Sequence, residues 1–353
     1  MELRSEVFKG ELLHPGGGFA PASLRLEVRW DPLTGHTARL IESPDPLFPP
    51  NTYDLAALAA ATQPDCPFCP HAVEVATPKL AAALWSEAAQ DSGGDGRIGR
   101  GQALLFPNLR AYAKHSSVAV YGTTLHYLSV AELGQDARLI GDNLAAQRDW
   151  LRAVWAADPA AGWASVNANH LFSSGSSVFH PHTQGAATPV PTTMQALLAQ
   201  VPPQRYADYL ATERRLGRRH LGSTGTIEWL SSFAPLGPAE LRAFVPGVAS
   251  PVELDDDRLA ELATGIATAL GLYGELGFES FNLALYGAPP GTVGYPLNLR
   301  MLVRSNLTQA EPYRSDATYL ERLHWEAAVD LPFTPEVLAE RAGDRFRGSG
   351  GKS

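Results

Sequence analysis

Alternating apolar and polar residues predict several strands along the chain. Within residues 24–30, leucine, valine and tryptophan alternate with polar residues, as in a strand with one buried face. A turn at 31–35 follows, and residues 36–41 could return as the second strand of a hairpin. Further strands are predicted at 116–121, 163–169, 177–184, 226–233, 281–286 and 297–303.

Apolar residues at helical spacing predict two long amphipathic helices, at 140–157 and 258–276. Residues 194–216 form a further helical stretch, and Thr334 followed by proline and glutamate predicts a helix start. Strands outnumber helices and do not alternate with them regularly, which favours an α+β fold with antiparallel sheets over a doubly wound parallel sheet. The element count fits two halves of related architecture, with residues 1–190 and 191–353 as the predicted domains.

The composition narrows the class of protein. Of the 353 residues, 45% are hydrophobic and 18% are charged, which is typical of a globular protein with a substantial core. A net charge of -9 and a pI of about 5.6 argue against broad binding to nucleic acid or to an anionic membrane. No stretch has the apolar length of a membrane span or of a signal peptide, so we expect a cytoplasmic protein with reduced thiols.

The sharpest local signal is the motif His180-Pro-His-Thr-Gln184. A residue before proline is held in an extended conformation, and alternate residues of an extended segment face the same side. His180, His182 and Gln184 are therefore predicted to share one face. Three polar side chains in a row make a poor core but a good site, and the alternative is an edge strand with two solvated histidines.

The only two cysteines, Cys66 and Cys69, form a Cys-x-x-Cys pair. Such a pair is half of a tetrahedral zinc site or a redox pair of the thioredoxin type. A redox pair would be expected between a strand and a helix, whereas here a proline follows each cysteine and the approach is rich in proline. Zinc, completed by histidines, fits this context better.

These motifs together resemble the galactose-1-phosphate uridylyltransferase family of the histidine triad superfamily. Asn169 lies eleven residues before His180, as in that family, and Ser176 and Ser177 occupy the place of a small polar pair. Residues 106–110 resemble the segment that contacts the nucleotide, and 334–341 resemble the final helix. The resemblance implies two tandem histidine-triad-like halves, each an antiparallel sheet with packed helices.

The resemblance also implies the roles of the motif residues. His180 would bind a single structural zinc ion together with Cys66 and Cys69. The fourth ligand would be His126, just past a predicted strand, with His115 as the alternative. His182 would be the nucleophile, and Gln184 would donate to the phosphoryl group. A set of nucleotide-binding residues is implied as well: Phe68, Asn108, Leu109, Arg110, Asn169, Ser176, Ser177 and Gln184.

The implied activity is the transfer of a nucleoside monophosphate, UMP first among the candidates, through a covalent nucleotidyl-histidine. The partners would be a nucleotide sugar and a sugar 1-phosphate, as in galactose metabolism, and the protein would be a homodimer. A phosphorylase or hydrolase acting on nucleotide sugars or dinucleotides, with phosphate or water as acceptor, is the alternative enzyme. A zinc-stabilised nucleotide binder without activity is the non-enzymatic alternative, and it leaves His182 unexplained.

The second half departs from the family pattern. Asn298 and Arg300 stand where many relatives have a His-x-His pair, so a second metal is not expected. Arg300 and Arg304 alternate along one strand and either hold an acceptor phosphate or form a solvated face. The glutamine that contacts the sugar has no clear match in residues 325–330, which puts galactose itself in question.

Overall fold

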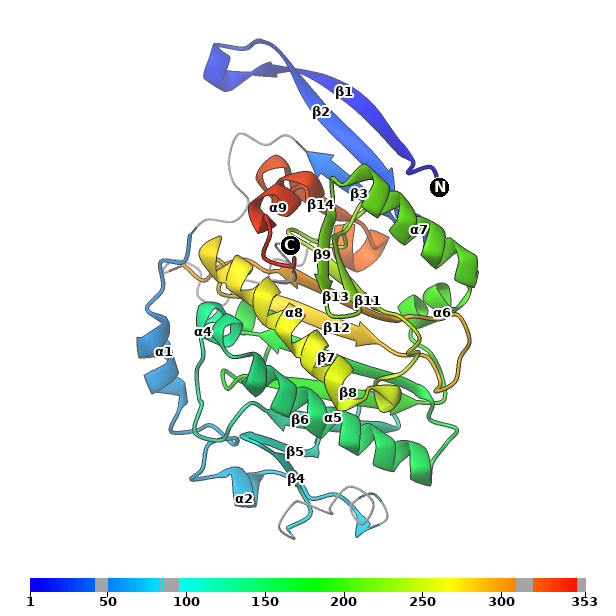
Figure 1. The fold of residues 1–353 in the computed structure, drawn as a ribbon. Helices are drawn as coiled ribbons and strands as arrows, with labels where there is room; N and C mark the ends of the chain where they lie inside the picture. The colour runs from blue at the N-terminus through cyan, green and yellow to red at the C-terminus, as the bar shows by residue number, and fades with distance from the viewer. Residues whose placement is uncertain (42–49, 83, 85–94, 309–319, 348–353) are drawn as a thin grey trace, which may run out of the picture.

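A sheet of ten strands runs through the whole molecule (Figure 1). The structure is a computed structural model that describes residues 1–41, 50–82, 84, 95–308 and 320–347. All neighbouring strands of this sheet pair antiparallel. In spatial order they are β4 (Ile98–Arg100), β5 (Ala103–Pro107), β6 (His115–Val120), β8 (His182–Thr188), β7 (Trp163–His170), β12 (Phe281–Tyr286), β13 (Leu297–Val303), β11 (Leu241–Val245), β10 (Ile227–Ser231) and β9 (His220–Thr224).

Two long helices, α5 (Ala137–Ala157) and α8 (Asp256–Glu275), cover one face of this sheet (Figure 1). Their apolar stripes are buried against the strands in one continuous core, which includes Trp150 of α5 and Leu270 of α8. The short helix α4 (Val130–Gln135) precedes α5 and packs against α8. Both long helices and the antiparallel sheet are confirmed, so the α+β fold class is correct.

The two halves of the chain follow the same order of elements. The first half runs through three strands β4–β6, helix α5 and strands β7 and β8. The second half runs through three strands β9–β11, helix α8 and strands β12 and β13. They join where β7 pairs with β12, from Phe281 opposite His170 to Tyr286 opposite Ser165. The large sheet is therefore five strands from each half, arranged in mirrored order about this junction.

A second, four-stranded sheet joins the two ends of the chain. It contains β1 (Ser5–His14), β2 (Ala20–Trp30), β3 (Thr37–Ile41) and β14 (Ala327–Asp330), with β3 and β14 parallel. The hairpin of β2 and β3 is confirmed, and β1 with β2 projects away from the body of the molecule (Figure 1). Strand β3 thus links the N-terminal hairpins to β14, a strand late in the described chain.

The remaining described helices lie at the margins. They are α1 (Leu55–Thr62), α2 (Val73–Ala76), α6 (Thr193–Ala199), α7 (Pro203–Leu216) and α9 (Pro335–Ala342). The stretch predicted at 194–216 is broken in two at Pro202 and Pro203, because proline cannot continue a helix that precedes it. The helix predicted after Thr334 is confirmed as α9. Within the described part of the chain, no helix has the length and apolar character needed to cross a membrane.

Candidate active site

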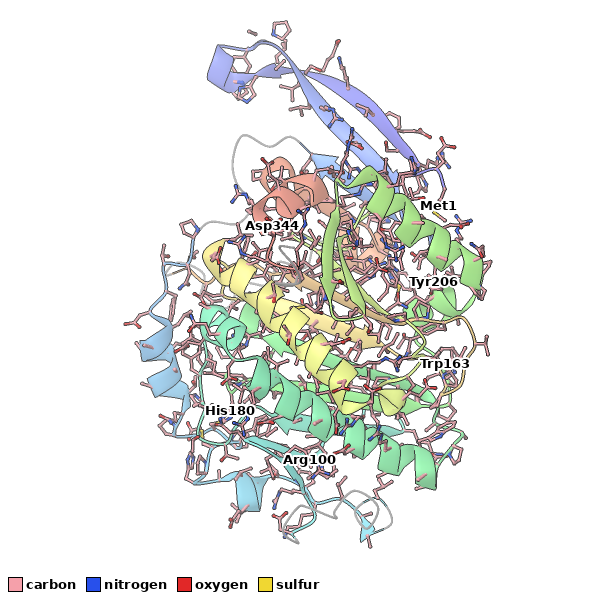
Figure 2. The ribbon with its side chains drawn as sticks, viewed as in Figure 1. Met1, Arg100, Trp163, His180, Tyr206 and Asp344 are labelled. Carbon is pink, nitrogen blue, oxygen red and sulfur yellow. The ribbon has the colours of Figure 1, made fainter. Side chains whose placement is uncertain are left out.

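Four buried side chains from distant parts of the first half converge at one point. Cys66 and Cys69 lie on the loop between α1 and α2, His126 follows β6, and His180 precedes β8. The Nδ1 atom of His180 is 3.5 Å from Cys66 Sγ and 3.6 Å from Cys69 Sγ, and His126 Nδ1 is 3.4 Å from Cys69 Sγ. Figure 2 places His180 in the lower part of the molecule, beside α1.

This geometry suits a tetrahedral metal ion such as zinc. With bond lengths of about 2.3 Å to sulfur and ~2.0–2.1 Å to nitrogen, tetrahedral ligands lie roughly 3.6 Å apart. The outer nitrogens are also oriented: His180 Nε2 donates to the Gly122 carbonyl at 2.9 Å, and His126 Nε2 lies 3.0 Å from Thr62 Oγ1. Both Nδ1 atoms are thereby left with a lone pair for a metal. The four residues can hold one.

The acid–base properties of the cluster agree with this. Burial lowers the pKa of His180 to about 4, so its imidazole is neutral as a metal ligand requires. Burial and the neighbouring Cys66 raise the pKa of Cys69 to about 12. The Cys69 thiolate would therefore not form here without a cation to neutralise it. His115, the alternative ligand, lies elsewhere and pairs through Nε2 with Asp158 at 2.7 Å.

Polar side chains of α5 bind the side of strand β8 that faces the helices. Thr183 donates to Asn143 Oδ1 at 2.6 Å and accepts from Gln147 Nε2 at 3.0 Å. Gln147 also accepts from Ser117 of β6 at 2.8 Å. A Cβ atom at Gly185 would lie 2.3 Å from Gln147 Oε1, so only glycine lets the helix approach this closely. These contacts fix the strand that carries the motif, and sequence reasoning did not identify them.

His182, the first residue of β8, projects from the face of the sheet opposite the helices. Its Nδ1–H donates to the His180 carbonyl at 2.8 Å, which assigns the proton to Nδ1 and leaves the lone pair on Nε2. Nε2 lies 3.5 Å from the amide nitrogen of Gln184, two residues along the same face. Burial lowers the pKa of His182, and its side chain is 7% exposed. The ring is therefore a neutral base aimed away from the core.

Strand β8 begins later than predicted. The sequence pattern placed a strand at 177–184 with His180, His182 and Gln184 on one face. The observed strand starts at His182, and His180 turns instead toward the cysteines. The shared face is correct for His182 and Gln184 and wrong for His180, because Pro181 separates the loop that carries His180 from the strand that carries His182.

A cavity of about 360 Å³ opens above His182. Besides His182, it gathers most of the residues for which nucleotide contacts were predicted: Phe68, Asn108, Leu109, Arg110, Ser177 and Gln184. The Phe68 ring stands edge-on to the His182 ring, with centroids 5.5 Å apart. Thr77 and Tyr112 also line the cavity and had no motif to reveal them. An apolar wall with a few convergent polar groups is typical of a small-molecule site.

Two predicted residues lie beside this cavity rather than in its lining. Asn169 Oδ1 accepts a hydrogen bond of 2.7 Å from Asn282 of β12. Ser176 donates to the Val178 carbonyl at 2.6 Å, which shapes the loop before the motif. Leu171, at the start of that loop, has φ 67° and ψ 173°, a conformation that non-glycine residues avoid. The loop is held in place by the buried Leu171 side chain.

The corresponding face of the second half is filled. Arg242 and Arg300 contact the Asp31 carboxylate at 3.0 and 3.4 Å, and Arg300 also contacts Glu240 at 2.7 Å. All four side chains are at most 3% exposed. Leu33 and the tyrosines of α7 close over them; one of these, Tyr206, is labelled in Figure 2, far from His180. Arg300 is therefore neither a solvated residue nor available to an acceptor phosphate.

Comparisons with known proteins identify the fold. No known family model matches the sequence. An uncharacterized protein of Archaeoglobus fulgidus is 28% identical over 351 residues, which cover 96% of this chain and 97% of that protein. An ADP-glucose phosphorylase from Arabidopsis thaliana, solved with ADP-glucose, aligns at a TM-score of 0.62 and 16% identity over 90% of this chain and 98% of its own. A uridylyltransferase aligns at 0.52 and 20% identity over 90% and 98%.

The chain is thus an α+β protein built on one large antiparallel sheet with packed helices. More particularly, its fold is that of the ADP-glucose phosphorylase and of the uridylyltransferase to which it aligns. The resemblance predicted from the motifs is confirmed at the level of the fold.

Proposed function

We propose that this protein is a nucleotidyltransferase that works through a covalent nucleotidyl-histidine on His182. The observation that carries the proposal is the state of His182 at the cavity. Its Nδ1–H is tied to the His180 carbonyl at 2.8 Å, and the Nε2 lone pair lies beside the Gln184 amide. A neutral imidazole oriented in this way is a competent nucleophile, and binding alone would not need one.

The first half-reaction is an attack of His182 Nε2 on the α-phosphorus of a nucleotide. The new P–N bond forms as the bond to the bridging oxygen breaks, and that oxygen keeps the electron pair and departs on the second phosphate. A sugar phosphate leaves without strong protonation, so catalysis rests on positioning and on hydrogen-bond donors. Gln184, Ser177 and Arg110 surround the cavity with such donors. The His180 carbonyl stabilises the proton that stays on Nδ1.

Zinc is the metal we assign to the cluster of Cys66, Cys69, His126 and His180. Four protein ligands close a tetrahedral site, and such sites are structural. When bound, the ion neutralises the two thiolates and cross-links the loop of the cysteines to the loop of the motif. His180 is then fixed, and its carbonyl, which accepts from His182, is fixed with it.

The proposed donor is a nucleotide sugar and the proposed acceptor a sugar 1-phosphate, with UMP as the group transferred. Inorganic phosphate or water as acceptor is the second candidate. It is favoured by the filled face of the second half, where Asn298 and Arg300 replace histidines of many relatives, and by the missing sugar-contacting glutamine in 325–330. The Arabidopsis protein of the same fold is an ADP-glucose phosphorylase.

We also infer that the chain is a tandem pair of histidine-triad-like units divided near residue 190. The repeated order of three strands, a helix and two strands supports this division. The turn between β2 and β3 contacts the second unit across this division, because Asp31 pairs with Arg242. A homodimer stays a prediction from the resemblance.

Labelling of the protein by a donor alone tests the proposed function. Wild-type protein incubated with a radiolabelled nucleotide sugar should retain label in a bond that is stable to base and cleaved by acid, as a phosphoramidate is. His182→Ala should abolish the label while zinc and fold persist. Gln184→Ala should slow labelling by about 10²–10³-fold if it acts as one oxyanion-type donor. His115→Ala, which removes a histidine outside the site, should label normally. Normal labelling of His182→Ala would overturn the proposal.

A further inference from the structure

Strand β1 has no neighbouring strand on its outer side within the described chain. It is the outermost strand of the four-stranded sheet and is ten residues long. Together with β2 it projects away from the body of the molecule (Figure 1). A long edge strand presents a row of unpaired N–H and C=O groups, which is a template for pairing with another chain.

Large apolar side chains of this projecting hairpin are left in solvent. Val7 and Phe8 are 50% and 48% exposed, and Leu13 is 61% exposed. A hairpin of two strands is at best marginally stable alone in water, and a group of exposed apolar side chains marks a surface that binds another molecule. The outer edge of β1 therefore has the backbone and the side chains of an interaction surface.

The order of residues along β1 indicates which molecule binds there. The segment from Glu6 to His14 reads acid, apolar, apolar, lysine, glycine, acid, apolar, apolar, histidine. The sequence on one side of Gly10 thus repeats in kind on the other side. If two copies of the strand run antiparallel about a two-fold axis at Gly10, each residue meets one of complementary character in the other copy. The facing pairs are Lys9 with Glu11, Phe8 with Leu12, Val7 with Leu13, and Glu6 with His14.

Neighbouring registers lose this match. An axis at Lys9 would place the apolar Val7 opposite the acidic Glu11, and an axis at Glu11 would place Lys9 opposite Leu13. Facing side chains of an antiparallel pair interact directly, and opposite charges or two apolar groups are the favourable combinations. The pattern therefore specifies both a second copy of this chain and the residue on which the two-fold axis lies.

The backbone of β1 has the phase that this register needs. Trp30 N–H donates to the Arg4 carbonyl at 3.1 Å, and the register of β1 with β2 is continuous from there. Hydrogen-bonded pairs alternate along an antiparallel ladder, so the even-numbered residues of β1 bond to β2 and the odd-numbered ones turn their N–H and C=O groups outward. An axis at Gly10 pairs odd residues with odd residues. About eight backbone hydrogen bonds can then form between the two copies.

Lys9 has no counter-charge in its own chain. In the ladder of β1 and β2 it lies opposite Arg25, whose ion-pair partner is Glu27 at 3.1 Å. Two like charges in facing positions are unfavourable. Among the residues that the structure describes, no acidic group pairs with Lys9. The partner's Glu11 supplies the missing carboxylate, and the two-fold axis makes this pair twice.

We propose that two copies of this chain associate through β1, edge to edge and antiparallel about Gly10. The pairing joins the four-stranded sheets of the two copies into one, and both copies use the same surface. Main-chain hydrogen bonds supply affinity, and the facing side chains select the register. Figure 2 shows Met1, beside the hairpin, well apart from His180, so the proposal does not depend on the proposed function.

Charge reversals at the two facing positions test this interface. Lys9→Glu and Glu11→Lys should each weaken the dimer by about tenfold or more, because two attractive pairs become repulsive. Neither change weakens the hairpin itself, since Lys9→Glu puts an acid opposite Arg25 and Glu11 lies opposite Ser23. Arg138→Glu, on the exposed side of α5, is the matched control and should dimerise as wild type does. Analytical ultracentrifugation over a range of concentrations would measure all of them.

A mixture of the two single variants tests the register most sharply. Equal amounts of Lys9→Glu and Glu11→Lys should form a mixed dimer of near wild-type affinity, because each acid then faces a lysine of the other chain. The double variant Lys9→Glu/Glu11→Lys should dimerise again for the same reason. A wild-type protein that stays monomeric at all concentrations would overturn the proposal. So would a dimer that neither single variant weakens, or a loss that the mixture does not restore.

Discussion

The open faces of the two halves use one scaffold for opposite purposes. In the first half, β8 presents His182 and Gln184 to a cavity of about 360 Å³. In the second half, β13 presents Asn298 and Arg300 on the same side of the sheet, and both are buried. Residues 31–36 and α7 cover that face, and Asp31 neutralises the arginines beneath them. The difference therefore lies in what covers the sheet, since the order of elements is the same.

The sides of β8 and β13 that face the helices differ as well. Strand β13 meets its helix through Leu299 and Met301, which are fully buried in the apolar core. Strand β8 meets α5 through Thr183 and Gly185, with Asn143 and Gln147 of the helix bonded to it. Hydrogen bonds specify one position more narrowly than apolar packing does. The half with the nucleophile has the more precisely fixed strand, which is what a catalytic geometry requires.

The largest effect is expected from the metal cluster, which only the first half has within the described residues. His126→Asn should release zinc and lower the free energy of unfolding by roughly 5 kcal/mol, a part of the ~10–16 kcal/mol that zinc supplies to small zinc domains. His115→Asn is the matched control and should keep about one zinc per chain. Elemental analysis and urea unfolding would measure both. A His126→Asn protein with full zinc content would contradict the ligand assignment.

A somewhat smaller effect is expected from the ion network of the second half. Asp31→Asn leaves Arg242 buried without its carboxylate and Arg300 with Glu240 alone, which should cost about 3–5 kcal/mol of unfolding free energy. The rate of labelling per folded molecule should not change. Asp208→Asn, on the exposed side of α7, should shift stability by less than ~0.5 kcal/mol. Equal stability of the two variants would show that Asp31 does not hold this face together.

The loss of stability in Asp31→Asn should depend on pH, and its direction can be stated. Burial alone would raise the pKa of Asp31, but Arg242, His36 and Arg300 outweigh it and hold that pKa well below its usual value. The ionised carboxylate therefore stabilises the fold at any pH above its unfolded pKa of ~3.9. The stability difference between wild type and Asp31→Asn should be present at neutral pH and shrink as the pH falls below about 4. A difference that grows as the pH falls below about 4 would contradict this assignment.

The smallest of these effects on stability is expected at Gly185. Alanine there would bring a methyl group within 2.4 Å of Ser117 Oγ and 2.3 Å of Gln147 Oε1, so overpacking should cost about 1–3 kcal/mol. Because the strand must move away from α5, labelling at His182 should slow as well. Met301→Leu, a volume-conserving change under β13, should alter neither by much. Unfolding and labelling rates of the two variants would measure this contrast.

Patterns along the chain were enough for the fold class and for the residues of the motif. Periodicity predicted both long helices and most strands, since their apolar positions recur at regular spacing. Ligand chemistry predicted that histidines complete the cysteine pair, and the family resemblance implied His180 and favoured His126 over His115. The structure brings His126 and His180 together with Cys66 and Cys69. The predicted direction of the His180 side chain was wrong, because the local effect of a proline does not determine at which residue a strand begins.

What escaped prediction depends on contacts between distant residues. Arg300 was predicted either to hold an acceptor phosphate or to lie on a solvated face. Both predictions were wrong, since its partners Asp31 and Glu240 lie 269 and 60 residues away in the sequence. Asn143 and Gln147 occupy polar positions of an amphipathic helix, and their partner Thr183 lies 40 and 36 residues further along the chain. Buried polar groups are chosen by their three-dimensional partners, and a one-dimensional pattern of hydropathy does not contain those partners.

The most direct test of the central claim is mass spectrometry of the intact protein after incubation with a panel of nucleotide sugars. The account predicts a gain of one nucleotidyl group, whose mass names the base, and peptide mapping that places it on His182. Subsequent addition of an acceptor phosphate should remove the added mass. Tight binding of a nucleotide without any mass gain, or a gain located on another residue, would contradict the covalent mechanism.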